Sequence, residues 1–202
     1  MDEKKSTVKD DRTRNWNFIL YPDSAPADWR EIIGSTNIEW VTSPLHDKDL
    51  NPDGEIKKAH YHVTLLFPGK KSFEQVKAIT DSLNAPIPIK CQSVKGSIRY
   101  MIHKDNPDKV QYDWNDIICY GGADLNALCA PTATERLQIQ KDILSFIRDN
   151  GLDEFSDLID GIEKMKNDEW LNVALNYSTI SINAYLRSRR HKAEKAQRSE
   201  ST

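Results

Sequence analysis

The chain has 202 residues, which is enough for one large domain or two small ones of roughly 100–150 residues each. It carries 28 basic and 31 acidic residues, a formal net charge of −3, which excludes a polybasic protein that holds nucleic acid by bulk charge alone. Because 38% of the residues are hydrophobic and 29% are charged, the composition predicts a packed core rather than a disordered chain.

Hydropathy and cysteine content limit the cellular location. The longest apolar runs, such as residues 63–67, are far shorter than the roughly 18 residues that a membrane span needs. The segment MDEKKSTVKDDRTR at the start of the sequence lacks the apolar stretch of a signal peptide. The three cysteines, Cys91, Cys119 and Cys129, form no CxxC pair. We therefore expect a cytoplasmic protein with reduced thiols and no membrane partner.

The first 120 residues alternate between the patterns of strands and helices. Runs rich in aromatic and β-branched residues predict strands, and apolar residues repeated every three or four positions predict helices. In chain order we expect a strand at 16–21, a helix at 26–33, a strand at 38–42, a polar loop at 45–58, a strand at 60–67, a helix at 72–83, a strand at 87–93, a helix at 95–104 and a strand or hairpin at 112–120. This order predicts an α+β domain over residues 1–123.

The rest of the chain has a different character. Residues 124–133 include a proline and show little periodicity, so we expect a linker there. Apolar residues at helical spacing then predict a small all-helical domain at 134–190. Residues 191–202 are expected to form a disordered basic tail.

Charge is distributed unevenly along the sequence. Residues 1–120 hold 17 basic and 18 acidic residues, residues 121–177 hold 5 and 11, and residues 178–202 hold 6 and 2. The basic end of the chain either contacts nucleic acid or is a solvated helix end.

Four of the five histidines lie between positions 46 and 103. His60 and His62 alternate on a predicted strand, so their side chains leave the same face about 7 Å apart. His46 and Asp49 lie in the loop HDKD after the neighbouring strand. Together these side chains form a mixed nitrogen and oxygen donor set suited to Mn²⁺, or to Mg²⁺ with phosphate oxygens. By itself an HxH pair is more often structural than metal-binding. The spacing of the histidines is also compatible with a zinc hydrolase. A metal site of the cupin type is disfavoured, because it would need Glu at the position that Leu66 occupies.

A second group of candidate residues occurs in SIRYMIHK. On the predicted helix, Tyr100 and His103 are three residues apart and share a face, with Arg99 and Lys104 as basic neighbours. A tyrosine at a helix edge is usually a packing residue, so the spacing alone assigns it no function.

The motifs FILYPDSAPADW, SPLHDKD and KKAHYHV, followed by Tyr100-Met101-Ile102-His103, closely resemble the replication initiators of streptococcal-type rolling-circle plasmids. Those proteins are HUH endonucleases, named for a His–hydrophobic–His strand, and Tyr61 occupies the middle position here. The resemblance covers residues 14–120 with its motifs in order, and the helical remainder more faintly.

The resemblance implies a fold and a set of site residues. The first domain would be a ferredoxin-like antiparallel sheet with helices that binds and nicks the origin, and the second an oligomerisation module that forms a ring of six. The metal ligands would be His46, Asp49, His60 and His62, with Asp47 as the competing carboxylate, and the nucleophile would be Tyr100. Apart from the resemblance, the chemistry makes His103 a candidate proton acceptor, a DNA contact or a solvent-exposed side chain.

The resemblance also implies a reaction and its partners. Attack of the tyrosine, assisted by Mn²⁺ or Mg²⁺, would leave a 5′-phosphotyrosine and a 3′-OH primer, and the same chemistry would rejoin strands at termination. The partners would be plasmid origin DNA, as duplex and as single-stranded hairpin, and a host helicase and polymerase. The alternatives are a non-catalytic DNA-binding regulator on the same fold and an HUH transposase.

Binding of DNA by a domain with almost no net charge requires its basic side chains to be concentrated on one face. The candidates are Arg12, Arg14, Lys57, Lys58, Lys70, Lys71, Lys95, Arg99 and Lys104.

Overall fold

Alternating burial along the strands builds one antiparallel sheet from the first part of the chain. The computed structural model describes residues 10–200, and the chain divides into one unit that ends at Ala130 and another that begins at Pro131. The strands of the first unit are β1 (Thr13–Leu20), β2 (Glu39–Thr42), β3 (Tyr61–Lys71), β4 (Ile89–Lys90) and β5 (Ile118–Tyr120). Their spatial order is β4-β1-β3-β2-β5, and every pair is antiparallel.

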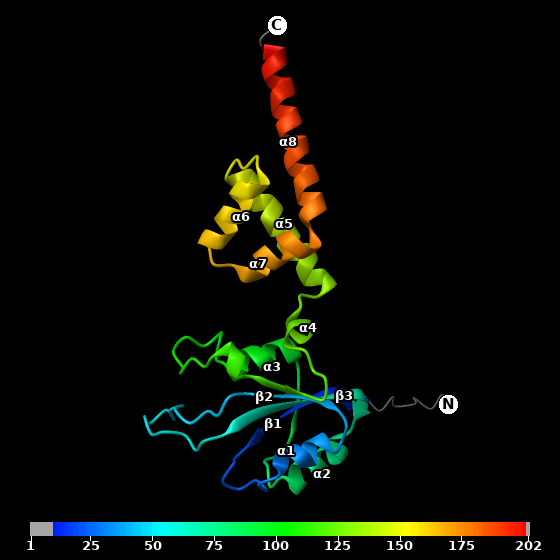
Figure 1. Cartoon of the computed structure of the whole chain (residues 1–202), viewed down its shortest axis with the longest axis vertical. Helices are drawn as coiled ribbons and strands as arrows, with labels where there is room; N and C mark the ends of the chain where they lie inside the picture. Colours follow the sequence, from blue (N-terminus) through cyan, green and yellow to red (C-terminus); the bar gives the residue numbers. More distant parts are fainter. Residues whose placement is uncertain (1–9, 201–202) are drawn as a thin grey trace, which may run out of the picture. The chain divides into compact units, whose positions relative to one another are not determined.

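Helices cover both faces of this sheet. Helices α1 (Trp29–Gly34) and α2 (Phe73–Ser82) lie on one face, and α3 (Val94–Met101) and α4 (Leu125–Cys129) lie on the other (Figure 1). The sequence β1-α1-β2-β3-α2-β4 with the strand order 4-1-3-2 is the ferredoxin-like arrangement, to which β5 adds an edge strand. The predicted α+β fold class is therefore confirmed.

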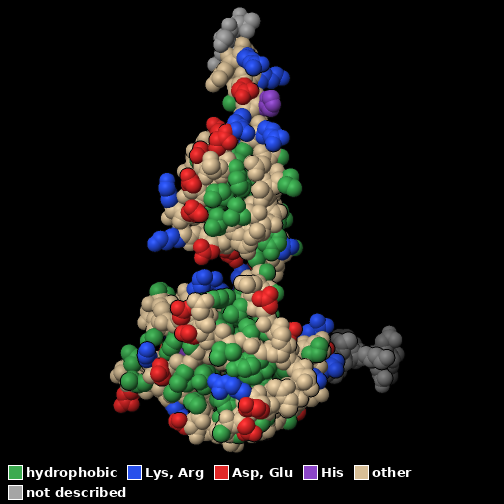
Figure 2. All heavy atoms as spheres, in the orientation of Figure 1, with side chains coloured by type: hydrophobic (Ala, Val, Ile, Leu, Met, Phe, Trp, Pro, Cys, Tyr) green, Lys and Arg blue, Asp and Glu red, His purple; other side chains and the backbone are tan. Residues whose placement is uncertain are grey.

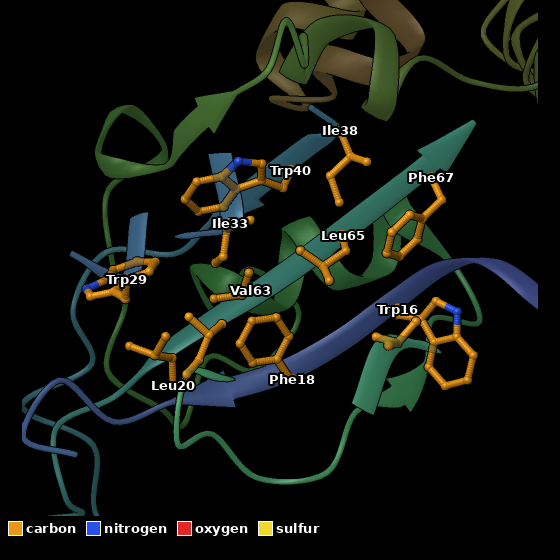
Figure 3. Packing of buried hydrophobic residues seen from close by; sticks show 12 residues of the cluster. Trp16, Phe18, Leu20, Trp29, Ile33, Ile38, Trp40, Val63, Leu65 and Phe67 are labelled. Carbon is orange, nitrogen blue, oxygen red and sulfur yellow. The ribbon is translucent and has the colours of Figure 1, made fainter. Parts of the chain in front are cut away.

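The large core lies between the sheet and helices α1 and α2. Its central strand contributes Val63, Leu65 and Phe67, which point to the same face because side chains alternate along a strand (Figure 3). Trp16 and Trp40 enter the same core from the two neighbouring strands. The intervening residues of β3 must therefore face α3 instead, where a second apolar cluster includes Ile98 and Met101.

The second unit is entirely helical, as expected. It consists of α5 (Ala133–Asp149), α6 (Phe155–Lys164), α7 (Asp168–Asn172), a π-helical turn (Val173–Tyr177) and α8 (Thr179–Glu200). Its buried residues come from all of these elements except α7 and include Ile143, Leu158, Ile162, Val173 and Ile182. Among the described helices, none combines the length and the apolar character that a membrane crossing requires.

Three expected segments differ from the structure in the first unit. The expected strand at 87–93 is reduced to two residues, because Pro86 and Pro88 have no N–H to donate to a sheet. In place of a hairpin at 112–120, a 3₁₀ turn (Trp114–Asp116) leads into β5. The expected linker contains α4, which the side chain of Asp124 caps by accepting a hydrogen bond from the backbone N–H of Asn126 at 2.9 Å.

The C-terminal end also differs from the expectation. Helix α8 continues to Glu200 through most of the segment that was predicted to be disordered. Residues 201–202 of that segment and residues 1–9 of the predicted first domain lie outside the described residues.

Gly121 is a position that only glycine can occupy. Its φ is +64°, and a Cβ there would lie 2.1 Å from the carbonyl oxygen of Ile38. Such contact with backbone cannot be relieved by a side-chain movement, so the glycine lets the chain leave β5 beside the start of β2.

Candidate active site

The face of β3 opposite the large core carries the histidines of the HxH motif. Beyond the end of β2, residue His46 forms an isolated antiparallel bridge with His60, with backbone N···O distances of 2.9 and 3.2 Å. The Ser43 hydroxyl accepts a hydrogen bond from the backbone N–H of His62 at 2.9 Å. As a result the loop that follows β2 lies against the start of β3, and the ring centroids of His46, His60 and His62 are 4.8–5.3 Å apart.

Backbone carbonyl groups fix the orientation of these imidazoles. His46 Nε2 is 2.8 Å from the carbonyl oxygen of Met101, and His60 Nδ1 is 2.8 Å from that of Lys58. A carbonyl only accepts hydrogen bonds, so each of these nitrogens carries the proton and the other nitrogen of each ring has a lone pair. His46 Nδ1 is buried and has no hydrogen-bond partner among the described residues.

Asp49 provides a carboxylate at the same place. Its Oδ2 lies 3.3 Å from His46 Nδ1, so a lone pair faces an anionic oxygen. The Tyr112 hydroxyl donates a hydrogen bond to Asp49 Oδ1 at 3.0 Å, and the Tyr112 ring stacks on His46 with a centroid distance of 4.2 Å. Asp49 is buried, whereas Asp47, the competing carboxylate, is exposed.

Helix α3 ends earlier than predicted, and the turn that follows it brings His103 to the cluster. The helix stops at Met101, and His103 has a φ of +56°. Backbone bonds from His103 N–H to Tyr100 and from Lys104 N–H to Arg99 close the helix end in a Schellman-type turn. A left-handed residue is the usual way in which such a turn closes a helix, and histidine is among the residues that tolerate it.

The imidazole of His103 lies inside the cluster rather than on the surface. Its side chain is only 1% exposed, so it cannot meet DNA directly. Nδ1 donates a hydrogen bond to the carbonyl oxygen of Val110 at 2.7 Å, and Nε2 lies 3.7 Å from Asp49 Oδ2. Two imidazole lone pairs, from His46 and His103, therefore face one carboxylate.

This donor set fits a divalent metal ion. Two overlapping groups of side chains have ligand atoms within 4.8 Å of one another, namely His46, His60 and His62, and His46, Asp49 and His103. The lone pair of His46 Nδ1 and the Asp49 carboxylate repel each other, and no hydrogen bond from the described residues reaches this nitrogen. A cation bound between them would remove that repulsion. The mixture of imidazoles and a carboxylate suits Mn²⁺ and other transition-series ions.

The ionisation of the cluster also suits a metal. Burial, helped by the neighbouring imidazoles, lowers the pKa of His62 to about 3. Burial also lowers the pKa of His46 below its ordinary value. For Asp49, burial favours the protonated form, but the Tyr112 hydroxyl and the imidazoles outweigh it and lower the pKa. The donors His46, His62 and Asp49 are thus in their metal-binding forms near neutral pH.

Tyr100 stands at the edge of the cluster with its side chain open to solvent. It is 42% exposed, and its ring lies edge-on to those of His62 and His103 at centroid distances of 5.3 Å. Lys109 Nζ donates a hydrogen bond to the Tyr100 hydroxyl at 3.1 Å and lies 4.7 Å from the centre of its ring. The structure thus brings Tyr100, a cation and the candidate metal ligands together.

From the sequence alone, Lys109 was not expected beside Tyr100, nor Tyr112 beside Asp49. The sequence pointed to Arg99 and Lys104 as the cations near Tyr100, but Arg99 forms an ion pair with Asp105. Lys109 approaches because the turn after His103 reverses the chain, with a backbone bond from Asn106 N–H to the His103 carbonyl at 2.8 Å. The Asn106-Pro107 pair was the available signal, since it favours a turn.

The candidate DNA-binding residues lie in separate places. Thr13 pairs with Lys71, so one group lies at the end of β3 away from the HxH motif, about 35 Å along an eleven-residue strand. That group consists of Arg12, Arg14, Lys70 and Lys71, of which Arg12 and Lys70 pair with Asp10. Lys57 and Lys58 precede His60, and Lys95, Arg99 and Lys104 belong to α3 or the turn after it.

Comparisons with known proteins identify the family. Residues 8–126 match the family described as plasmid replication protein, origin binding domain, and residues 133–191 match that described as replication protein RepB, C-terminal. The chain belongs to the plasmid replication proteins. It is 43% identical over 187 residues to a replication protein of Staphylococcus aureus, covering 93% of this chain and 94% of the relative.

Two further relatives support the same assignment. A replication protein RepB of Lactiplantibacillus plantarum is 41% identical over 186 residues, which cover 92% of this chain and 84% of the relative. A replication protein RepB of Streptococcus agalactiae is 26% identical over 176 residues, covering 82% and 83% of the two chains. The predicted recognition as a plasmid replication initiator is therefore confirmed, and the first unit carries the origin-binding domain.

Metal binding provides the first test of the site. Replacing His60 or His62 with Ala should weaken Mn²⁺ binding by about tenfold or more, because each removes one nitrogen donor from the cluster. Calorimetric titration of the full chain with Mn²⁺ measures the effect. His191→Ala is the matched control, since that imidazole is on α8 and its side chain is 81% exposed. Unchanged affinity in both cluster variants would show that the histidines have a structural role only.

Proposed function

We propose that this replication initiator nicks one strand of its plasmid origin by attack of Tyr100 on a phosphodiester. The observation that carries the proposal is the position of Tyr100. It is a solvent-exposed phenol beside a buried imidazole–carboxylate cluster, within the domain that matches origin-binding domains. A domain that only bound DNA would have no use for a buried donor set next to an exposed tyrosine.

The proposed reaction exchanges one phosphodiester for another. The Tyr100 oxygen attacks phosphorus, the bond from phosphorus to the 3′ oxygen breaks, and the phosphate stays on the 5′ end as a phosphotyrosine. The phenol loses its proton to solvent, which reaches this exposed side chain, and the departing 3′ oxygen takes up a proton to become the primer hydroxyl. Because the phosphotyrosine bond conserves the energy of the broken one, the reverse attack rejoins strands without ATP.

The chain's own residues have distinct tasks in this proposal. His46, Asp49, His60 and His62 would hold the metal ion, with His103 as a further donor. When bound, a divalent ion such as Mn²⁺ or Mg²⁺ neutralises charge on the phosphate oxygens. We assign His103 to this set rather than to proton transfer, because its two nitrogens face Val110 and Asp49.

Lys109 is proposed to activate the nucleophile. A phenol with an ordinary pKa of about 10 is mostly protonated at neutral pH, so its reactive form needs a nearby positive charge. Lys109 donates directly to the Tyr100 hydroxyl at 3.1 Å. The ammonium group would therefore stabilise the negative charge that develops on the tyrosine oxygen when that oxygen attacks, and again when it leaves during rejoining.

The alternatives use the same fold in different ways. A non-catalytic regulator would bind the origin without forming an adduct, and a transposase would form the adduct on the ends of a mobile element. The match to origin-binding and RepB C-terminal families favours a replication initiator. The proposed partners are duplex and single-stranded hairpin forms of the origin, and a host helicase and polymerase that use the primer.

We further propose that the helical unit assembles copies of the chain, in the ring of six that the resemblance implies. Large apolar side chains remain exposed on this unit, and four of them lie on α5, the π-helical turn and the start of α8: Leu137, Leu175, Tyr177 and Ile180. Ile180 is 88% exposed, and Figure 2 shows apolar side chains gathered on one face of the unit. A second copy of the chain would cover such a surface.

The nucleophile is tested by removing one oxygen. Tyr100→Phe should abolish nicking of a supercoiled plasmid that carries the origin, and it should also abolish the covalent protein–DNA adduct, because no other group replaces the phenol. Origin binding should stay within about twofold of the wild type, since the ring is retained. Gel analysis of open circles and adduct decides between the outcomes. Nicking at the wild-type rate would refute the assignment.

Lys109 is tested by its charge. Lys109→Ala should slow nicking by about 10- to 100-fold, which corresponds to losing one charge-assisted hydrogen bond of about 1.5–3 kcal/mol. Lys109→Arg keeps the charge and should recover most of the rate. The control is Lys77→Ala, an exposed lysine on α2 across the sheet, where nicking should be unchanged. Equal rates for Lys109→Ala and the wild type would exclude the proposed role.

Assembly is tested on the full chain by light scattering. The wild type should have the mass of an oligomer at micromolar concentration, and Ile180→Glu should lower that mass, because a buried carboxylate destabilises an apolar contact. Ile56→Glu is the control, since Ile56 is 68% exposed in a loop of the first unit. A monomeric wild type, or an oligomer that the Ile180 change leaves intact, would contradict this assignment of the surface.

A further inference from the structure

A cleft of about 610 Å³ opens beside the candidate nucleophile. It lies on the α3 side of the sheet, and its lining comes from β1, β3, β4, α3 and the segments before and after β4. Tyr100 and His62 belong to its lining, so the cleft is continuous with the site proposed for strand cleavage.

The walls of the cleft carry exposed apolar side chains. Ile87 and Ile89 line it and are 65% and 60% exposed. Pro86 and Met101 also contribute apolar atoms. Ile89 lies on the edge strand β4, whose exposed positions in ordinary proteins carry charged residues that prevent association. These side chains therefore suit a partner with apolar surfaces.

Three of the polar side chains in the lining, Asn17, Thr64 and Ser97, form one connected network. Asn17 donates from its amide nitrogen to the Ser97 hydroxyl at 2.8 Å and accepts from the Thr64 hydroxyl at 2.9 Å. A side-chain amide has two N–H groups and two acceptor lone pairs, so these bonds leave capacity for one more donor and one more acceptor. Because both neighbours hold the amide in place, the cleft presents an oriented polar group among apolar walls.

The charge of the lining agrees with a nucleic-acid ligand. Among the described residues that line the cleft there is no Asp or Glu, and the cation is Lys90, which pairs with Asp11 outside the lining. An acidic lining would repel the phosphates of a strand that enters the neighbouring site, and this one does not.

We propose that the cleft binds the base of a nucleotide next to the scissile phosphate, turned out of its stack in single-stranded origin DNA. This inference rests on the proposed nicking function. A nucleobase has two apolar faces and a polar edge, which match the isoleucine and proline walls and the amide of Asn17. Enzymes that turn a base out of its stack hold it in a pocket through its polar edge and its apolar faces. The base in the cleft would anchor the strand so that its phosphate lies at Tyr100.

The test measures binding of the full-length Tyr100→Phe variant, which cannot cleave its ligand. The probes are single-stranded oligonucleotides that span the nick site mapped on the origin plasmid, each with one base removed. Loss of the base that occupies the cleft should weaken binding by about tenfold, the effect of one base contact. Removal of the bases further along should have little effect.

Changes to the cleft identify the place of the contact. Adding Ile89→Glu to the Tyr100→Phe variant should weaken its binding of the intact probe by a similar factor. Removal of the critical base from the probe should then cause no further loss of affinity. Ile87→Glu should act in the same way. Ile118→Glu is the control, because this isoleucine is 46% exposed on β5, the other edge strand. That control should keep the full effect of base removal.

The possible failures are distinguishable. The inference is wrong if removal of no single base weakens binding, or if the effect of base removal persists in Ile89→Glu, because the cleft then does not hold a base. The proposed function would still stand in that case, provided that the wild type nicks the origin and forms the adduct. If Ile89→Glu lowers the mass of the oligomer instead, the cleft is a contact between subunits, which also overturns the inference. If the wild type forms no adduct at its origin, the proposed function fails first.

Discussion

The burial of one face of β3 is the constraint on which the rest of the first unit depends. Val63, Leu65 and Phe67 fill the core beneath α1 and α2, and each is worth about 1.5–3 kcal/mol when it leaves water. Since side chains alternate, this choice sends His62 and Thr64 to the opposite face. A shift of one residue in the register of β3 would move its three apolar side chains out of the large core and place the His62 imidazole in that core instead. The folding energy of the core therefore fixes the face on which the candidate site lies.

The polar cluster on that face is held in place by hydrogen bonds to the main chain. Main-chain carbonyls of Lys58, Met101 and Val110 each hold a ring nitrogen of one histidine. These bonds select the tautomers and leave the other nitrogens directed toward the interior. A buried lone pair beside the Asp49 carboxylate costs stability, and the sheet and α3 supply the packing that sustains it. Such a cost is expected at a binding site and unexpected in a purely structural core.

The two faces of α3 connect the core with the candidate site. Ile98 and Met101 pack toward the sheet, which holds the helix firmly, while Tyr100 lies between the cluster and the cleft. The exposed tyrosine is thus carried by an element whose position the core determines. The helical unit has its own core and its own exposed apolar residues, so the proposed nicking and the proposed assembly would use separate parts of the chain.

The sequence by itself was sufficient for what depends on local pattern. Period-two and helical spacing identified most strands and helices, and the helix expected at 72–83 is present as α2, with Ser72 as its N-cap. The motifs around His46, His60 and Tyr100 indicated the family that the comparisons show. Tertiary structure decided what depends on long-range approach. Only the Schellman-type turn at His103 brings that imidazole to Asp49, and only the reversal after it brings Lys109 to Tyr100. Neither contact has a periodic signal, because each depends on how a loop closes against packed elements that lie far away in the sequence.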